Sequence, residues 1–104
     1  MYVILTSKPG QFRTESGPGL RPVESYDYLF CGTRKARFVI AELLHDTKVT
    51  IVDETPPACV NVVPSKLLER FDTVDRARGA LKSLTVFGRM DTTLLRLEPN
   101  GAAP

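Results

Sequence analysis

The stretch that decides the fold of this chain is residues 26–43, which read YDYLFCGTRKARFVIAEL. Its first part alternates, so that three aromatic side chains share one face of an extended strand: Tyr26, Tyr28 and Phe30. Residues 32–35 contain Gly32 and three polar or basic residues, a composition that predicts a hairpin connection. Residues 36–43 carry apolar side chains on both faces. That pattern predicts a second strand in the centre of a sheet.

Strands are also expected on either side of this hairpin. Residues 2–6 are apolar and partly β-branched, and they stop at a Lys-Pro-Gly turn. Residues 8–22 contain Gly17-Pro18-Gly19 and are interpreted as a long mobile loop. After a turn at 44–47, residues 48–53 resume the alternation. Three consecutive short strands predict an antiparallel meander.

The second half of the chain predicts one more edge strand and two helices. Residues 58–63 follow paired prolines and are expected at a sheet edge. A first helix is predicted over 65–71, because Pro64 suits the first helical position. Asp72 or Thr73 is expected to cap a second helix. The apolar stripe of that helix consists of Val74, Ala77, Leu81 and Leu84.

These elements predict an α+β fold, in which a mainly antiparallel β-meander is covered on one face by two C-terminal helices. The alternative is an SH3-like small barrel with appended helices, because short strands with tight turns can also close. Residues 92–98 are expected to form a last strand, and residues 99–104 a frayed tail. The length of 104 residues predicts a single domain over 1–104.

Composition narrows the function classes. The chain has 14 basic and 12 acidic residues, a balance that argues against a dedicated nucleic-acid binder. No apolar run approaches the roughly 18 residues of a membrane helix, so no membrane partner is expected. The N-terminal residues 1–6 are typical of a strand and not of a secretion signal. We therefore expect a cytoplasmic protein.

No catalytic residue, cofactor or metal site is predicted. His45 is the single histidine, and it falls in the predicted turn at 44–47 next to Asp46, which is typical of a solvated loop. A zinc site needs more nitrogen and sulfur ligands than the chain offers. Cys31 and Cys59 lie next to apolar residues, so we expect both to be reduced and buried.

The segment 54–66 is the candidate for protein recognition. Its three prolines restrict the backbone, and stiff segments lose little entropy when they bind. The candidate protein-binding residues are Glu54, Pro56, Pro57, Asn61 and Lys66. The leading hypothesis is a non-catalytic accessory protein that binds another protein or itself, as a homodimer, through an exposed strand edge.

Two alternatives remain open at this point. One is a module for single-stranded nucleic acid that uses the 26–38 hairpin, where aromatic and basic side chains adjoin. Its candidate residues are Tyr26, Tyr28, Arg34, Lys35 and Arg37. Exposed tyrosine rings would favour nucleic acid, whereas buried rings would favour a core. The other alternative is a small enzyme with a site between subunits, which requires His45, Cys31 or Cys59 beside a carboxylate.

Overall fold

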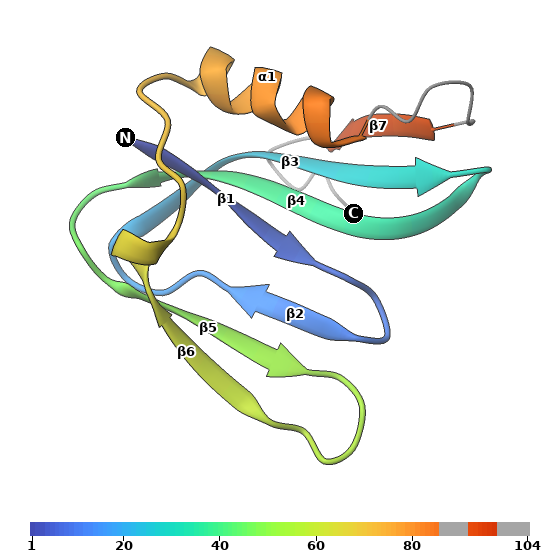
Figure 1. Cartoon of the computed structure of the whole chain (residues 1–104), viewed down its shortest axis with the longest axis horizontal. Helices are drawn as coiled ribbons and strands as arrows, with labels where there is room; N and C mark the ends of the chain where they lie inside the picture. The colour runs from blue at the N-terminus through green and yellow to red at the C-terminus, as the bar shows by residue number, and fades with distance from the viewer. Residues whose placement is uncertain (86–91, 98–104) are drawn as a thin grey trace.

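A computed structural model describes residues 1–85 and 92–97 of the chain (Figure 1). The elements are β1 (Tyr2–Ser7), β2 (Phe12–Glu15), β3 (Leu20–Phe30), β4 (Thr33–Leu43), β5 (Lys48–Asp53), β6 (Val60–Pro64), the 3₁₀ turn η1 (Ser65–Leu67), α1 (Val74–Thr85) and β7 (Thr92–Leu97). They form a four-stranded sheet in the order β1-β4-β3-β7 and a three-stranded sheet in the order β2-β5-β6. Every ladder is antiparallel. The mainly antiparallel α+β character predicted from the sequence is confirmed.

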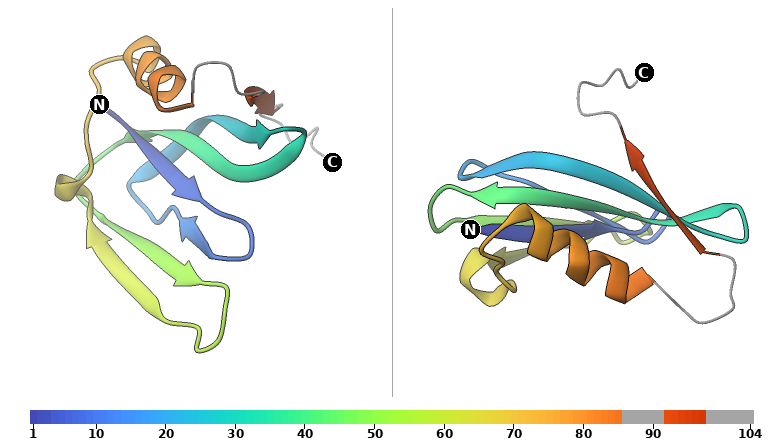
Figure 2. Two further views of the ribbon diagram at one scale, coloured as in Figure 1. Left: turned by 45° about the vertical axis from the view of Figure 1, so that its right-hand side comes forward. Right: turned by 90° about the horizontal axis from the view of Figure 1, so that it is seen from above.

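The four-stranded sheet is the middle layer of the molecule. Helix α1 lies over one of its faces and the three-stranded sheet under the other, as Figures 1 and 2 show. β4 lies between β1 and β3, which confirms that the strand with two apolar faces is central. Because a strand alternates its side chains between the two faces of a sheet, β4 contributes to the packing on both sides.

Two cores result from this layering. The inter-sheet core consists of Val3, Leu5, Leu20, Ala41 and Val49, all buried. The helix core consists of Tyr26, Ile40, Ala77 and Leu81. Neighbouring residues of β4 therefore belong to different cores, Ile40 to the helix core and Ala41 to the inter-sheet core.

The predicted meander is wrong beyond the β3–β4 hairpin. Both edges of β4 are already occupied, by β1 and by β3, so the next strand along the chain cannot pair with it. β5 instead crosses to the three-stranded sheet and lies between β2 and β6. Proximity in sequence predicted a pairing that the available hydrogen-bonding edges do not allow.

Residues 8–22 are not a long loop. They contain β2, which pairs with β5 from Phe12 opposite Asp53 to Glu15 opposite Thr50. β3 then begins at Leu20, whose side chain is buried in the inter-sheet core. The partner that makes β2 a strand comes much later in the chain, so a local pattern of four residues could not identify it.

The predicted first helix over 65–71 is reduced to the short turn η1. The reason is Phe71, whose backbone exchanges two hydrogen bonds of 2.8 Å with Tyr2 at the edge of β1. That bridge holds the segment extended before α1 begins. The second predicted helix is confirmed as α1, and the Thr73 hydroxyl accepts a hydrogen bond of 3.1 Å from the backbone N–H of Arg76.

The sheets also meet side by side along β1 and β2. The backbone N–H of Thr14 donates to the Ser7 hydroxyl at 2.9 Å, and the Thr14 hydroxyl donates to the carbonyl of Thr6. Within residues 1–85 and 92–97, no ladder closes the two sheets into the small barrel that was the alternative fold. The last predicted strand is confirmed as β7, and the frayed tail predicted for 99–104 lies outside the described residues.

Candidate functional site

The protein-binding residues predicted from the sequence gather around β6. Asn61 lies within this strand, Lys66 lies in η1 directly after it, and Pro56 and Pro57 lie in the exposed loop before it. Glu54 is the exception. Its carboxylate accepts a hydrogen bond of 3.0 Å from the backbone N–H of Gly10, so it is directed away from β6 toward the start of β2.

β6 is an outer strand, and in the described part of the chain no strand pairs with its second edge. Figure 1 shows it farthest from β2 in the lower sheet, with β5 on its inner side only. The carbonyl of Cys59 accepts a bond from Asp53, and the N–H of Ser65 donates to Thr47, so these two residues face β5. Backbone groups of an antiparallel strand alternate between its two edges.

This alternation directs the N–H and C=O groups of Val60 and Val62 outward, away from β5. Pro64 also faces outward, but it adds only a carbonyl because proline has no N–H. No strand lies against this outer edge among residues 1–85 and 92–97. This edge therefore presents backbone hydrogen-bond donors and acceptors that a further strand could pair with.

The side chains of the same two valines form an exposed apolar surface. Val63 lies opposite Val49, a buried member of the inter-sheet core, so Val63 faces inward. Val60 and Val62 face the other way and are 60% and 55% exposed. Residues 60–64 carry no charge, whereas edge strands that must not pair usually carry one, often lysine. The sequence analysis missed these valines, although an uncharged β-branched run in a predicted edge strand was the available signal.

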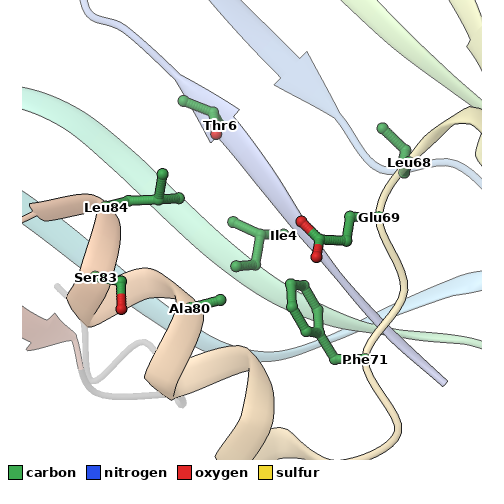
Figure 3. Close-up of a pocket in the computed structure, with 8 residues that line it drawn as sticks. All are labelled: Ile4, Thr6, Leu68, Glu69, Phe71, Ala80, Ser83 and Leu84. Atoms are coloured by element: carbon green, nitrogen blue, oxygen red, sulfur yellow. The ribbon is translucent and has the colours of Figure 1, made fainter.

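A second apolar feature is a groove of about 400 Å³ between α1, β1 and the segment 68–71 (Figure 3). In the view of Figure 3, the Phe71 ring and Leu84 of α1 lie on opposite sides, with the Ile4 side chain of β1 between them. Its polar lining groups come from Thr6, Glu69 and Ser83. Nothing in the sequence analysis pointed to this groove, because it forms between elements that are distant along the chain.

The residues proposed for nucleic-acid binding separate into two environments. Tyr26 is only 8% exposed and belongs to the helix core, and Tyr28 is half-buried with its ring 6.4 Å from that of Phe38. Lys35 is exposed on β4. The rings are therefore packed rather than presented as an open stacking surface, which by the burial criterion favours a core.

The two arginines of that set line a cavity of about 390 Å³ near the β3–β4 hairpin, together with Arg13 and Glu54. Their charges are largely compensated. Arg37 bonds Asp27 at 2.9 Å, which raises the pKa of Arg37, and Arg34 lies 4.0 Å from the same carboxylate. Arg13 pairs with Glu15 at 3.0 Å and with Glu54 at 3.8 Å. The cavity is thus an ion-paired surface with little excess positive charge.

The most strongly perturbed ionisable group is Glu24 of β3, whose side chain is 3% exposed. It accepts hydrogen bonds from Arg78 of α1 at 2.8 Å and from the Tyr26 hydroxyl at 2.6 Å, and Arg96 of β7 lies 3.2 Å away. The bond from Arg78 is the main cause that lowers the pKa of Glu24 to about 2, although burial opposes it. Burial, followed by the bond to Glu24, raises the pKa of Tyr26. This cluster ties helix and strands together and leaves no open carboxylate for a substrate.

The reactive groups of the enzyme hypothesis are not brought together. Cys31 lies at the β3–β4 turn, whereas His45 follows the opposite end of β4, and Cys59 lies in the loop before β6. Both cysteines are free and exposed, so the predicted burial was wrong: one occupies a tight turn and the other a loop. Within the described part of the chain, no three histidine, cysteine or acidic side chains are grouped to hold a metal ion.

Comparison with known proteins gives no further identification: no family model, no curated protein and no solved structure matches this chain. In residues 1–85 and 92–97, no helix has the length and apolar character needed to cross a membrane.

Proposed function

We propose that this chain is a non-catalytic accessory protein of the cytoplasm that binds an extended segment of a protein along the outer edge of β6. The observation that carries the proposal is the open edge of β6, with the outward backbone groups of Val60 and Val62 and their two exposed side chains.

Strand addition explains why both backbone and side chains matter at such an edge. An incoming strand bonds to the free N–H and C=O groups, and each net hydrogen bond contributes roughly 0.5–1.5 kcal/mol. The exposed valines supply apolar contact on one face of the extended sheet. Pro56, Pro57 and Lys66 flank the two ends of the strand, where they would limit how far the added strand can extend.

The nucleic-acid alternative has less support. Tyr26 is buried, and the carboxylates of Asp27 and Glu54 offset the charge of the arginines beside them. A phosphate backbone binds best to uncompensated positive charge, because binding releases counterions from it.

The proposal is tested with two matched lysine substitutions. Val62→Lys places a charge on β6 at a position that is 55% exposed, and Leu84→Lys places the same charge in the α1 groove at a similarly exposed position, 59%. Each variant and the wild type are compared by light scattering over a concentration series and by affinity purification from native lysate. Any recovered protein is then purified and titrated against all three, with circular dichroism confirming that the variants fold.

We expect Val62→Lys to weaken binding at least tenfold, while Leu84→Lys binds like the wild type, because the lysine opposes addition of a strand only at the edge that receives it. A strictly monomeric wild type that recovers no partner would count against the proposal. Equal binding by Val62→Lys and the wild type would refute the assignment to β6.

A further inference from the structure

We propose that the strand received by β6 is the β6 strand of a second copy of this chain, paired antiparallel about a two-fold axis at Asn61. This inference rests on the proposed function and adds the identity of the partner and the register of pairing. The two three-stranded sheets would then join into one six-stranded sheet in the order β2-β5-β6-β6-β5-β2.

The backbone pattern of the edge is self-complementary in this register. With the axis at Asn61, Val60 of each copy lies opposite Val62 of the other, and both residues have outward-facing N–H and C=O groups. Each such pair exchanges two hydrogen bonds, so the N–H and C=O groups of Val60 and Val62 in each copy are all used. A register centred on Val62 would instead place Val60 opposite Pro64, which has no N–H to return.

The side chains agree with the same register. Val60 and Val62 lie on the outer face of their sheet, so pairing brings the four valines of two copies together on one face. β-Branched residues in cross-strand pairs stabilise a sheet. The two Asn61 side chains lie opposite each other on the other face, and an amide both donates and accepts hydrogen bonds.

Charge distinguishes a second copy from an arbitrary partner. Residues 60–64 are uncharged, so two identical edges meet without like-charge repulsion. A charged partner strand would find no complementary charge within β6 itself. The segment that best matches an uncharged, valine-rich edge with two donors is therefore the same segment in another copy.

The interface is expected to be small. In this register only Val60, Asn61 and Val62 lie opposite β6 residues of the other copy, so the pairing buries less than the roughly 1,200–2,000 Å² of a standard stable interface. We therefore expect a weak, reversible dimer whose population rises with protein concentration.

Disulfide trapping tests the register directly. In a background of Cys31→Ser and Cys59→Ser, the substitution Asn61→Cys introduces a single thiol at the proposed axis. Residues opposite each other in a non-hydrogen-bonded antiparallel pair have Cα atoms about 4.5 Å apart, within the range of a disulfide. The matched variant Val60→Cys places its two thiols on Cα atoms about 8–9 Å apart, beyond that range.

Under mild oxidation, Asn61→Cys should form a covalent dimer at least tenfold faster than Val60→Cys or the distant control Leu84→Cys. Adding Val62→Lys to Asn61→Cys should reduce the rate to that of the controls. In light scattering, the wild type without any cysteine change should shift from monomer toward dimer as its concentration rises.

Three outcomes would overturn the inference or its register. A wild type that stays monomeric at millimolar concentration, or an Asn61→Cys rate equal to that of Leu84→Cys, excludes self-pairing. Faster trapping of Val62→Cys than of Asn61→Cys overturns the proposed register. If self-pairing fails while a purified partner still binds in a Val62-dependent way, the proposed function stands and only its partner changes.

Discussion

Glu24 is the residue on which three elements converge. It lies on β3, is bonded by Arg78 of α1 and lies within 3.2 Å of Arg96 of β7. Charge-assisted hydrogen bonds to a buried carboxylate are stronger than neutral ones. Glu42 of β4 is half-buried, makes an ion pair with the exposed Arg21 and serves as a natural comparison.

Substitution Glu24→Gln should destabilise the protein by about 1–3 kcal/mol, because it keeps the shape but removes the charge that the two arginines bond. Glu42→Gln should cost less than about 1 kcal/mol, because an ion pair with a largely exposed arginine contributes little. Urea unfolding at pH 7 measures both. A loss for Glu24→Gln no larger than that for Glu42→Gln would show that the cluster does not stabilise the fold.

The stabilising effect of Glu24 is expected to depend on pH. The folded pKa of Glu24 is lowered to about 2 from an ordinary value of 4.5, so the ionised form stabilises the folded state. That contribution is fully present above pH 4.5 and is lost as the pH falls toward 2. The difference in stability between the wild type and Glu24→Gln should therefore shrink over this range, and a constant difference would contradict the assignment.

Among the elements, the β3–β4 hairpin shows most directly how local sequence makes structure. Its turn consists of Cys31 and Gly32, which have positive φ angles of 51° and 80°. Two-residue hairpin turns with positive φ at both positions prefer Asn-Gly, because glycine has no β-carbon to clash and the short polar side chain of asparagine can hydrogen-bond locally. The turn therefore lies two residues earlier than the centre of the predicted connection over 32–35.

Cys31→Asn should stabilise the protein by roughly 0.5–1 kcal/mol, and Gly32→Ala should destabilise it by about 1 kcal/mol or more. Cys59→Asn, in an exposed loop, is the control for loss of a thiol and should change little. Thermal unfolding of the three variants measures the effects. Equal shifts for the two asparagine variants would mean that the turn geometry is not the cause.

At the scale of the whole molecule, β4 couples the two cores. Ile40 packs in the helix core and Ala41 in the inter-sheet core, on opposite faces of one strand. If β4 unfolded, the side chains of both cores would be exposed to solvent. The prediction of a single domain over 1–104 therefore becomes a prediction of one cooperative unfolding transition.

Leu5→Ala in the inter-sheet core and Leu81→Ala in the helix core should each destabilise the protein by about 2–5 kcal/mol, because both delete buried methyl groups. Both substitutions should lower the midpoint of the same single unfolding transition, followed by far-ultraviolet circular dichroism and by tyrosine fluorescence. Leu67→Ala, at a position 71% exposed, is the matched control and should have little effect. Separate transitions for the two signals would show that the layers unfold independently.

The sequence by itself determined the elements whose signals are local. Alternation predicted β3, β4 and β5, a polar cap and helical spacing predicted α1, and paired prolines with a short apolar run predicted the edge strand β6. The sequence also placed the predicted protein-binding residues Asn61, Lys66, Pro56 and Pro57 in the segment around β6, and their role in binding stays a prediction. These features depend only on residues that are close together in the sequence, so the sequence alone is enough to predict them.

Only the tertiary structure decided which strands pair and which side chains remain exposed. β2 is a strand because it pairs with β5. The end of the segment 65–71 is extended because Phe71 forms backbone hydrogen bonds with Tyr2 of β1. β5 does not pair with β4, because β1 and β3 already occupy both edges of β4. The same limit explains the two valines of the candidate site. Exposure of Val60 and Val62 depends on which face of β6 meets Val49, a contact between strands that no local pattern encodes.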